Sequence, residues 1–323
     1  MRNRNTTGWS IILIAATVGG LGACSDVVQP RALAAPPIAD LARLDLSAMT
    51  LVTIDVPGST DTFAMDVNAD DDVVGRFGLG GATHGFLRTV DGQFTTIDFP
   101  GASFTAASGI NNRGDIVGMY ALPTAPTERH GFLLSDGEYT TLDPAGSKFT
   151  NLLGVGPSGD IVGRYCTKIP CGRAGSGPYH GLLVHDGEIT SFDVPTSVET
   201  NAWKITPQGS IVGGFRYADN VNHLFVLRAD EFSTIDLPRG LRVAQDDGAM
   251  NPRGDIVGTY CVTSPCDLTT AGRRGFVLRD GQLASIELPG AITTSAQGIN
   301  AHGDVAGAYG DASARTHGYL LKR

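Results

Sequence analysis

Residues 93–120 read QFTTIDFPGASFTAASGINNRGDIVGMY, and residues 130–137 continue with HGFLLSDG. This stretch contains four short runs rich in β-branched and aromatic residues, separated by Pro-Gly, Asn-Arg-Gly and Asp-Gly. Such runs between turn residues are typical of β-strands, and Asp-Gly is a pair that two-residue hairpin turns prefer. The stretch therefore predicts a unit of four antiparallel strands.

The same pattern recurs along the chain from residue 51 onward. The glycine of its Ile-Val-Gly step marks the copies, which are Gly75, Gly118, Gly163, Gly213, Gly258 and Gly307. Units of four strands at this spacing predict an all-β protein, a six-bladed β-propeller of four-stranded blades. An open solenoid built of the same units is the alternative. The 43 glycines recur at fixed places, so they indicate turns and not a disordered segment.

The order of the strands within a blade follows from the turns. Asp136-Gly137 joins the fourth run of one copy to the first run of the next, so these two runs must be hairpin neighbours. Each blade then contains the second, third, fourth and first runs. The last copy ends at residues 317–323 without a following first run, whereas the chain has a spare first run at residues 51–55. We expect residues 51–55 to join the last blade and close the ring.

The run GFLxxDGxxTTIDxPGAxxTxxxGINxxGDIVGxY resembles the extracellular repeat of the HAF family of secreted bacterial proteins, over residues 51–323. The resemblance implies export and a β-propeller-like fold. It implies no reaction, and it therefore transfers no catalytic residue.

The N-terminus, residues 1–24, reads MRNRNTTGWSIILIAATVGGLGAC. A basic start, an apolar run and a small-residue stretch form the layout of a secretory signal peptide, and the apolar run is shorter than the roughly 20 residues of a membrane span. Leu21-Gly22-Ala23-Cys24 resembles the bacterial lipobox. We expect residues 1–23 to be a lipoprotein signal peptide and Cys24 to carry the lipid that anchors the chain in the membrane. The alternative is an ordinary signal peptide with an accidental cysteine.

Residues 24–50 carry no repeat and contain Pro36-Pro37, which predicts a lipidated tether ahead of a propeller domain at 51–323. Ser25 after the cysteine favours the outer membrane, on its periplasmic or surface face.

Four further cysteines form two pairs, Cys166 with Cys171 and Cys261 with Cys266, each with four residues between. Export into an oxidising compartment predicts two local disulfides. A four-thiolate zinc site is the competing interpretation, but such sites favour a two-residue spacing. We therefore expect no metal.

Several positions of the repeat carry chemistry-bearing side chains. One is histidine in five copies, His84, His130, His180, His223 and His317, with Arg274 in the sixth. A second is acidic, at Asp55, Asp98, Asp143, Asp193, Asp236 and Glu287. We expect the histidines to bond a neighbouring blade or turn, the carboxylates to cap the following turn, and the aromatic residues that end the third runs to pack between blades.

A ligand site should lie where the repeat is broken. The strand that we expect to be innermost departs from it most at Asp66, Trp203, Lys204, Asp246 and Asp247, where other copies have mostly small residues. These side chains could line a central funnel and bind a small polar or sugar-like ligand. The alternative is that they have drifted in a tolerant pore.

The net charge of −9 argues against a nucleic-acid partner, which needs a basic patch. We expect an exported, lipid-anchored monomer that acts as a non-enzymatic binding or scaffold module of the cell envelope, without a cofactor, for a glycan or an envelope protein. The alternative is a hydrolase or lyase that acts on a polysaccharide or glycopeptide at the funnel.

Overall fold

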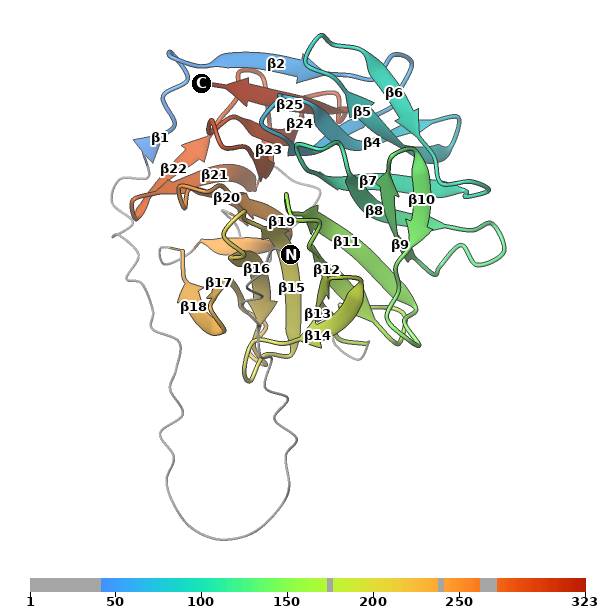
Figure 1. Cartoon of the computed structure of the whole chain (residues 1–323). Helices are drawn as coiled ribbons and strands as arrows, with labels where there is room; N and C mark the ends of the chain where they lie inside the picture. The colour runs from blue at the N-terminus through green and yellow to red at the C-terminus, as the bar shows by residue number, and fades with distance from the viewer. Residues whose placement is uncertain (1–41, 173–176, 238–240, 262–271) are drawn as a thin grey trace, which may run out of the picture. The chain divides into compact units, whose positions relative to one another are not determined.

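The computed structural model describes residues 42–172, 177–237, 241–261 and 272–323. Its regular structure consists of β-strands (Figure 1). Within these ranges no helix is long and apolar enough to span a membrane. The predictions about residues 1–41, including the signal peptide and the lipid on Cys24, lie outside the described residues, as does Cys266.

The third copy of the repeat illustrates how one unit folds. Its strands are β11 (Phe149–Val155), β12 (Ile161–Cys166), β13 (His180–His185) and β14 (Glu188–Phe192), and neighbours in this order pair antiparallel. These are the second, third, fourth and first runs of the sequence pattern, in the expected order. Asp186 and Gly187, which join β13 to β14, have φ angles of 49° and 78°, as a two-residue hairpin turn requires.

The other copies repeat this arrangement. Their strands are β3 (Thr62–Val67), β4 (Val73–Leu79), β5 (Ala82–Arg88) and β6 (Phe94–Ile97); β7 (Phe104–Ile110), β8 (Ile116–Ala121), β9 (His130–Ser135) and β10 (Glu138–Thr141); β15 (Glu199–Ile205), β16 (Ile211–Arg216), β17 (Asn222–Arg228) and β18 (Glu231–Ile235); β19 (Arg242–Met250), β20 (Ile256–Cys261), β21 (Arg273–Arg279) and β22 (Gln282–Ile286); and β23 (Thr293–Ile299), β24 (Val305–Gly310) and β25 (Thr316–Lys322). The chain is an all-β propeller with four-stranded blades.

The hydrogen-bonded sheets differ in size from the six separate four-stranded sheets that the sequence predicts. Three sheets have four strands, one has five, and one has eight. The eight-stranded sheet joins β3–β6 to β7–β10 through one parallel residue pair, Thr83 with Phe104. The five-stranded sheet contains β19–β22 and the short strand β1 (Ala42–Arg43), which pairs parallel with β22.

The N-terminal strand β2 (Thr50–Ile54) lies beside β25, close to the C-terminus (Figure 1). The two strands pair antiparallel from Thr50–Lys322 to Ile54–Gly318. The pairing of the spare first run with the last repeat is therefore confirmed. Beside it, Asp55 accepts a hydrogen bond of 2.9 Å from Nδ1 of His317, so the two ends of the repeat region are also joined through side chains.

Residues 42–50, which the sequence assigns to a tether, belong in part to the folded domain. Besides the pairing of β1 with β22, Arg43 forms an ion pair of 3.1 Å with Glu287. Leu44, Leu46 and Met49 pack against the cluster that contains Ile286 and Tyr319. The short apolar positions of this segment therefore cover a sheet instead of spanning solvent.

The glycine that marks the repeat leaves room for an aromatic ring in several copies. A Cβ atom on Gly118 would lie 2.0 Å from the carbonyl oxygen of Ala106 and 2.9 Å from the ring of Phe132. Gly75 and Gly213 meet Phe86 and Phe225 in the same way. Because these rings are fully buried, the glycine lets adjacent strands pack closely around a large apolar side chain.

The predicted disulfide between Cys166 and Cys171 is present. It connects the end of β12 to the loop that leads toward β13. The proposed partner of Cys261 lies outside the described residues, so the second disulfide stays a prediction.

Candidate functional site

The first strands of the six copies as the structure groups them, β3, β7, β11, β15, β19 and β23, are here called the inner strands. Each contacts the next, and β23 contacts β3. In β3, β7, β11, β15 and β23 the pairing register shifts near the carboxyl end, immediately before one equivalent position. That position is Gly109, Gly154 and Gly298 in three of the strands, but Asp66 in β3 and Lys204 in β15.

The glycines at this position show how close the inner strands come. A Cβ atom on Gly109 would lie 2.8 Å from the carbonyl oxygen of Leu153, and one on Gly298 would lie 2.7 Å from Cα of Asp66. Most inner strands therefore have no space for a side chain here. The space that remains is filled by the side chains of Asp66 and Lys204.

Lys204 and Asp66 form a nearly buried ion pair, with 12% and 9% of their side chains exposed. The ammonium nitrogen of Lys204 lies 2.8 Å from Oδ2 of Asp66. It also donates to the carbonyl oxygens of Ser108, at 2.9 Å, and of Leu153, at 2.7 Å. The same carboxylate oxygen accepts the backbone N–H of Ile110 at 3.0 Å.

The number of partners defines what this pair can do. An ammonium group has three N–H donors, and Lys204 has three acceptors in contact distance. The ammonium group therefore has no donor left for a substrate. The pair joins β15 to β3, β7 and β11, so its first effect is to lock inner strands together.

A cavity, here called the axial cavity, lies next to this pair, at the carboxyl ends of the inner strands. Its volume is about 140 Å³, and each inner strand or the turn after it contributes to the wall. Asp66 and Lys204 are part of this wall. Around them lie neutral polar or apolar groups such as Asn112, Pro157 and Pro207. The cavity is therefore suited to a small, uncharged polar group.

Four of the turns that surround the cavity share a motif that we call the Asn–Asp box, an asparagine followed four residues later by an aspartate. In the second repeat, Oδ1 of Asn111 accepts the backbone N–H groups of Arg113 and Asp115, at 2.9 and 3.1 Å. Its Nδ2 donates to Oδ2 of Asp115 at 2.8 Å and to the carbonyl oxygen of Gly156, in the next repeat, at 3.1 Å. The box therefore forms the turn and also ties one repeat to the next.

Two of the box aspartates, Asp115 and Asp255, are stabilised in their charged form. Burial alone would raise the pKa of Asp115, but hydrogen bonds from Ser135, Asn111 and Arg113 outweigh it and leave the pKa lowered. The pKa of Asp255 is lowered for the same reason, with Arg279 as the main donor. Sequence reasoning identifies these segments only as hairpins. The recurring pair of Asn and Asp four residues apart is the signal that would have indicated the box.

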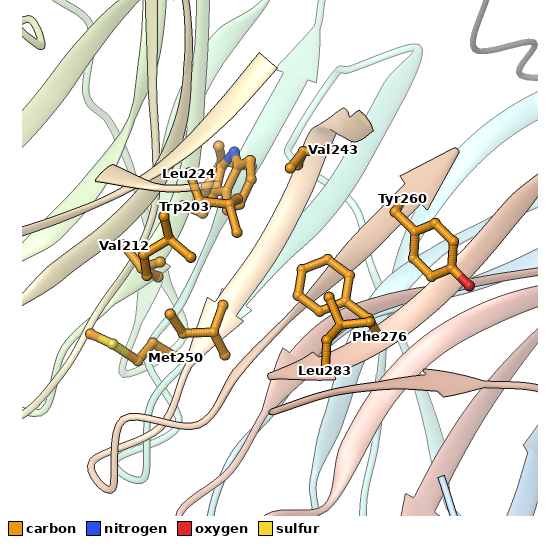
Figure 2. Packing of buried hydrophobic residues seen from close by; sticks show 11 residues of the cluster. Trp203, Val212, Leu224, Val243, Met250, Tyr260, Phe276 and Leu283 are labelled. Atoms are coloured by element: carbon orange, nitrogen blue, oxygen red, sulfur yellow. The ribbon is translucent and has the colours of Figure 1, made fainter. Parts of the chain in front are cut away.

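Trp203 has 1% of its surface exposed and belongs to the hydrophobic core. It packs in one cluster with Leu224 and Val243, as Figure 2 shows. Its ring also fills the space beside Gly214 and Gly248, where a Cβ atom would lie 2.5 and 2.8 Å from the indole. The suggestion that Trp203 lines a funnel is therefore wrong, because the register shift beside it turns its side chain between two sheets.

Asp246 and Asp247 lie in β19, close to a register shift between Val243 and Gly248. Their side chains lie outside the described residues. The structure therefore brings together two of the five suggested ligand-binding residues, Asp66 and Lys204.

The repeated histidines and carboxylates meet each other within one blade. His130 Nδ1 lies 2.6 Å from Asp143 and His180 Nδ1 lies 2.8 Å from Asp193. The expectation that the carboxylate caps the following turn is therefore replaced by a bond to the histidine of the neighbouring strand. Each histidine ring also lies against the aromatic residue that ends the third strand, as His130 does on Tyr120 with ring centroids 5.2 Å apart. These groups connect strands of the same blade.

Asp71, His302 and Asp304 place metal-ligand atoms within 4.8 Å of one another. The ammonium of Lys322 lies 2.6 Å from Oδ2 of Asp71, and the backbone N–H of Arg323 donates to Asp304 at 2.7 Å. Protein groups therefore already satisfy both carboxylates.

The comparison with protein-family models finds no match, and the comparison with curated proteins finds no relative. The HAF resemblance therefore stays a prediction. Solved structures do match. A structure from an analysis of two prolyl endopeptidases has a TM-score of 0.50 and 9% identity, over 84% of this chain and 40% of that chain.

Virginiamycin B lyase from Staphylococcus aureus matches with a TM-score of 0.48 and 14% identity, over 85% of this chain and 99% of that chain. The β-propeller domain of the Trilobed protease from Pyrococcus furiosus matches with a TM-score of 0.47 and 10% identity, over 82% of each chain. At such identities the likeness concerns the fold, and it says nothing about the activity of this chain.

Proposed function

We propose that the chain is an exported, lipid-anchored propeller that acts as a non-enzymatic binding or scaffold module of the cell envelope. The observation that supports a non-enzymatic role is the Lys204–Asp66 pair. These are the ionisable side chains at the wall of the axial cavity, and they satisfy each other and the surrounding backbone. A general acid or base must instead be free to exchange a proton with a substrate.

The proposed ligand is a glycan or an envelope protein that meets the turns around the axial cavity. A screen of glycans and peptidoglycan fragments against the full chain in detergent tests this, with Ala301→Trp as the variant that fills the cavity rim. Thr124→Trp, in an exposed loop at the opposite ends of the strands, is the matched control. Binding that is lost in Ala301→Trp and kept in Thr124→Trp supports the proposal. Binding that neither substitution changes contradicts it.

Membrane attachment rests on the sequence of residues 1–24. Cells supplied with labelled palmitate should incorporate label into the wild-type chain and not into Cys24→Ala. Fractionation of the same cells should place the labelled chain in the outer membrane. Label that persists in Cys24→Ala would contradict lipidation at this residue.

A hydrolase or lyase that acts on a polysaccharide or glycopeptide is the second candidate. It is favoured by one observation, the presence of two ionisable side chains within 2.8 Å of each other at the cavity. Release of new reducing ends or unsaturated products, lost in Lys204→Met, would favour it over the binding module.

We also infer that the eight-stranded sheet contains two blades, so that the ring has six. The Thr83–Phe104 pair that joins its halves has a counterpart in the parallel bridge Arg129–Phe149, which lies between two separate sheets. Closure of the ring is supported by the pairing of β2 with β25 and by Asn300, whose Nδ2 donates to the carbonyl oxygen of Asn68 at 3.1 Å. An experimental density map would count the blades, and light scattering would test the monomer.

A further inference from the structure

The fourth repeat has an incomplete Asn–Asp box. Thr206 stands where four other repeats have asparagine and the third repeat has Gly156, and Ser210 stands where all the others have aspartate. The turn itself is retained, because Ser210 N–H donates to the Thr206 hydroxyl at 3.2 Å and Thr206 N–H donates to the carbonyl oxygen of Ser210 at 2.9 Å. What is missing is the carboxylate.

In other repeats that carboxylate has a partner on the fourth strand. Ser135 donates to Asp115 at 2.6 Å, and His185 Nδ1 lies 2.7 Å from Asp160. In the fifth repeat, Arg279 binds Asp255 with two nitrogens, at 3.0 and 3.1 Å. A two-nitrogen contact of this kind is the strong geometry for a guanidinium and a carboxylate.

Arg228 is the counterpart of Arg279 in the fourth repeat. Its Nε donates to the Ser210 hydroxyl at 3.1 Å. Within the described part of the chain it has no carboxylate partner, and Glu231, its neighbour in the register of β18, forms no ion pair with it. The fourth repeat therefore keeps the cation of the pair and lacks the anion.

Arg228 borders a cavity of about 310 Å³ that is also lined by Thr206, Gln208, Ser210 and Asn251. This volume lies at the lower end of the range for small-molecule sites. Thr206 also borders the axial cavity, so the two cavities adjoin. A guanidinium in a cavity lined by hydroxyl and amide groups fits an anion that carries hydroxyls.

We infer that this cavity binds a small hydroxylated carboxylate, of the sugar-acid class. The ligand's carboxylate takes the place of the missing aspartate and pairs with Arg228, as Asp255 pairs with Arg279. The Ser210 hydroxyl and the amide of Gln208 contact the remaining polar atoms. The inference deepens the proposed binding function, on which it rests, by naming a ligand class and a place for it.

Calorimetric titration of the full chain in detergent with D-glucuronate tests the site, with glucose as the neutral probe of the same size. Arg228→Gln removes the cation, and Ser210→Asp supplies the carboxylate from the protein itself. Arg113→Gln is the matched control, because Arg113 is an exposed arginine of the box turn in the second repeat. We expect glucuronate to bind the wild type and Arg113→Gln equally, and about tenfold or more weakly to Arg228→Gln and Ser210→Asp.

Glucuronate binding that is absent in the wild type, or unchanged in both site variants, overturns the inference. So does equal binding of glucose, or displacement of glucuronate by the same concentration of inorganic sulfate. If glucuronate fails while the glycan screen finds a ligand that Ala301→Trp blocks, the carboxylate site is refuted and the proposed function stands. If the glycan screen finds no ligand that Ala301→Trp blocks while glucuronate still binds, the glycan site at the axial cavity is refuted and the carboxylate site stands.

Discussion

Lys204 and Asp66 occupy the same position of the repeat, three copies apart, and their charged groups meet at 2.8 Å. Glycine stands at that position in three other copies, where the backbone of the next inner strand leaves no room for a Cβ atom. A cation and an anion thus form a pair at a position where other copies have glycine. A buried charge that has lost its partner is less well compensated, so each side chain stabilises the other.

The first prediction concerns this pair. Lys204→Met should lower the free energy of unfolding by about 3 kcal/mol, because it leaves Asp66 buried without its cation. Asp66→Asn should have a smaller effect, since Lys204 keeps its two carbonyl acceptors. The double variant Lys204→Met/Asp66→Asn should lose less than the sum of the single variants. Denaturant unfolding of all four proteins measures this coupling, and additive losses would show that the pair does not act as a unit.

The second prediction concerns the Asn–Asp box. Asn111→Ala removes four hydrogen bonds, one of them to the next repeat, and should destabilise the protein by about 2–3 kcal/mol. The adjacent Asn112→Ala removes a single bond, from the backbone N–H of Ala69, and should destabilise it by about 1 kcal/mol. Thermal and denaturant unfolding measure both. Equal losses would contradict the assigned role of Asn111.

The repeat itself could be predicted from the sequence because it is periodic. The order of strands within a blade and the pairing of residues 51–55 with the last repeat followed from the position of Asp-Gly turns, and both are present. Each depends on local chemistry and on which repeat is incomplete. The identity of the residues that depart from the repeat, Asp66 and Lys204, could be found in the same way.

What these residues contact could not be predicted. The contact between Lys204 and Asp66 depends on how closely the inner strands approach one another, and the sequence of the repeat does not indicate that distance. The orientation of Trp203 depends on a register shift of one residue, which turns it from a cavity into the core. The histidine partners of the repeated aspartates, such as Asp143 and Asp193, could not be predicted because they lie more than ten residues away in the sequence.

The third prediction concerns pH. The hydrogen bond with Asp160 raises the pKa of His185 above 6.5, and burial opposes this only in part. A raised pKa in the folded state means that the stabilisation is fully present below the unfolded value of about 6.5 and is lost as pH rises through the folded pKa. His185→Gln should therefore reduce stability at pH 5.5 and have little effect at pH 8.5.

The titration of His185, followed by NMR, provides the direct check. Its midpoint should lie above 6.5 in the wild type and fall in Asp160→Asn. His302, an exposed histidine in the box turn of the last repeat, serves as the control variant His302→Gln. A stability difference for His185→Gln that does not change with pH would contradict the ion pair.

The fourth prediction uses the incomplete box of the fourth repeat. The double variant Thr206→Asn/Ser210→Asp restores the pattern of the fifth repeat, in which Asn251 donates to Asp255 at 3.0 Å and Arg279 binds the same carboxylate. It should raise the free energy of unfolding by about 1 kcal/mol, because Arg228 gains a charged partner beside a turn that is already formed. Denaturant unfolding at pH 7 measures the gain. In an Arg228→Gln background the same two substitutions should stabilise the protein much less, since the new carboxylate would then lie in the turn without its cation. A gain of equal size in both backgrounds would mean that the turn alone is responsible, and that Arg228 does not pair with the new carboxylate.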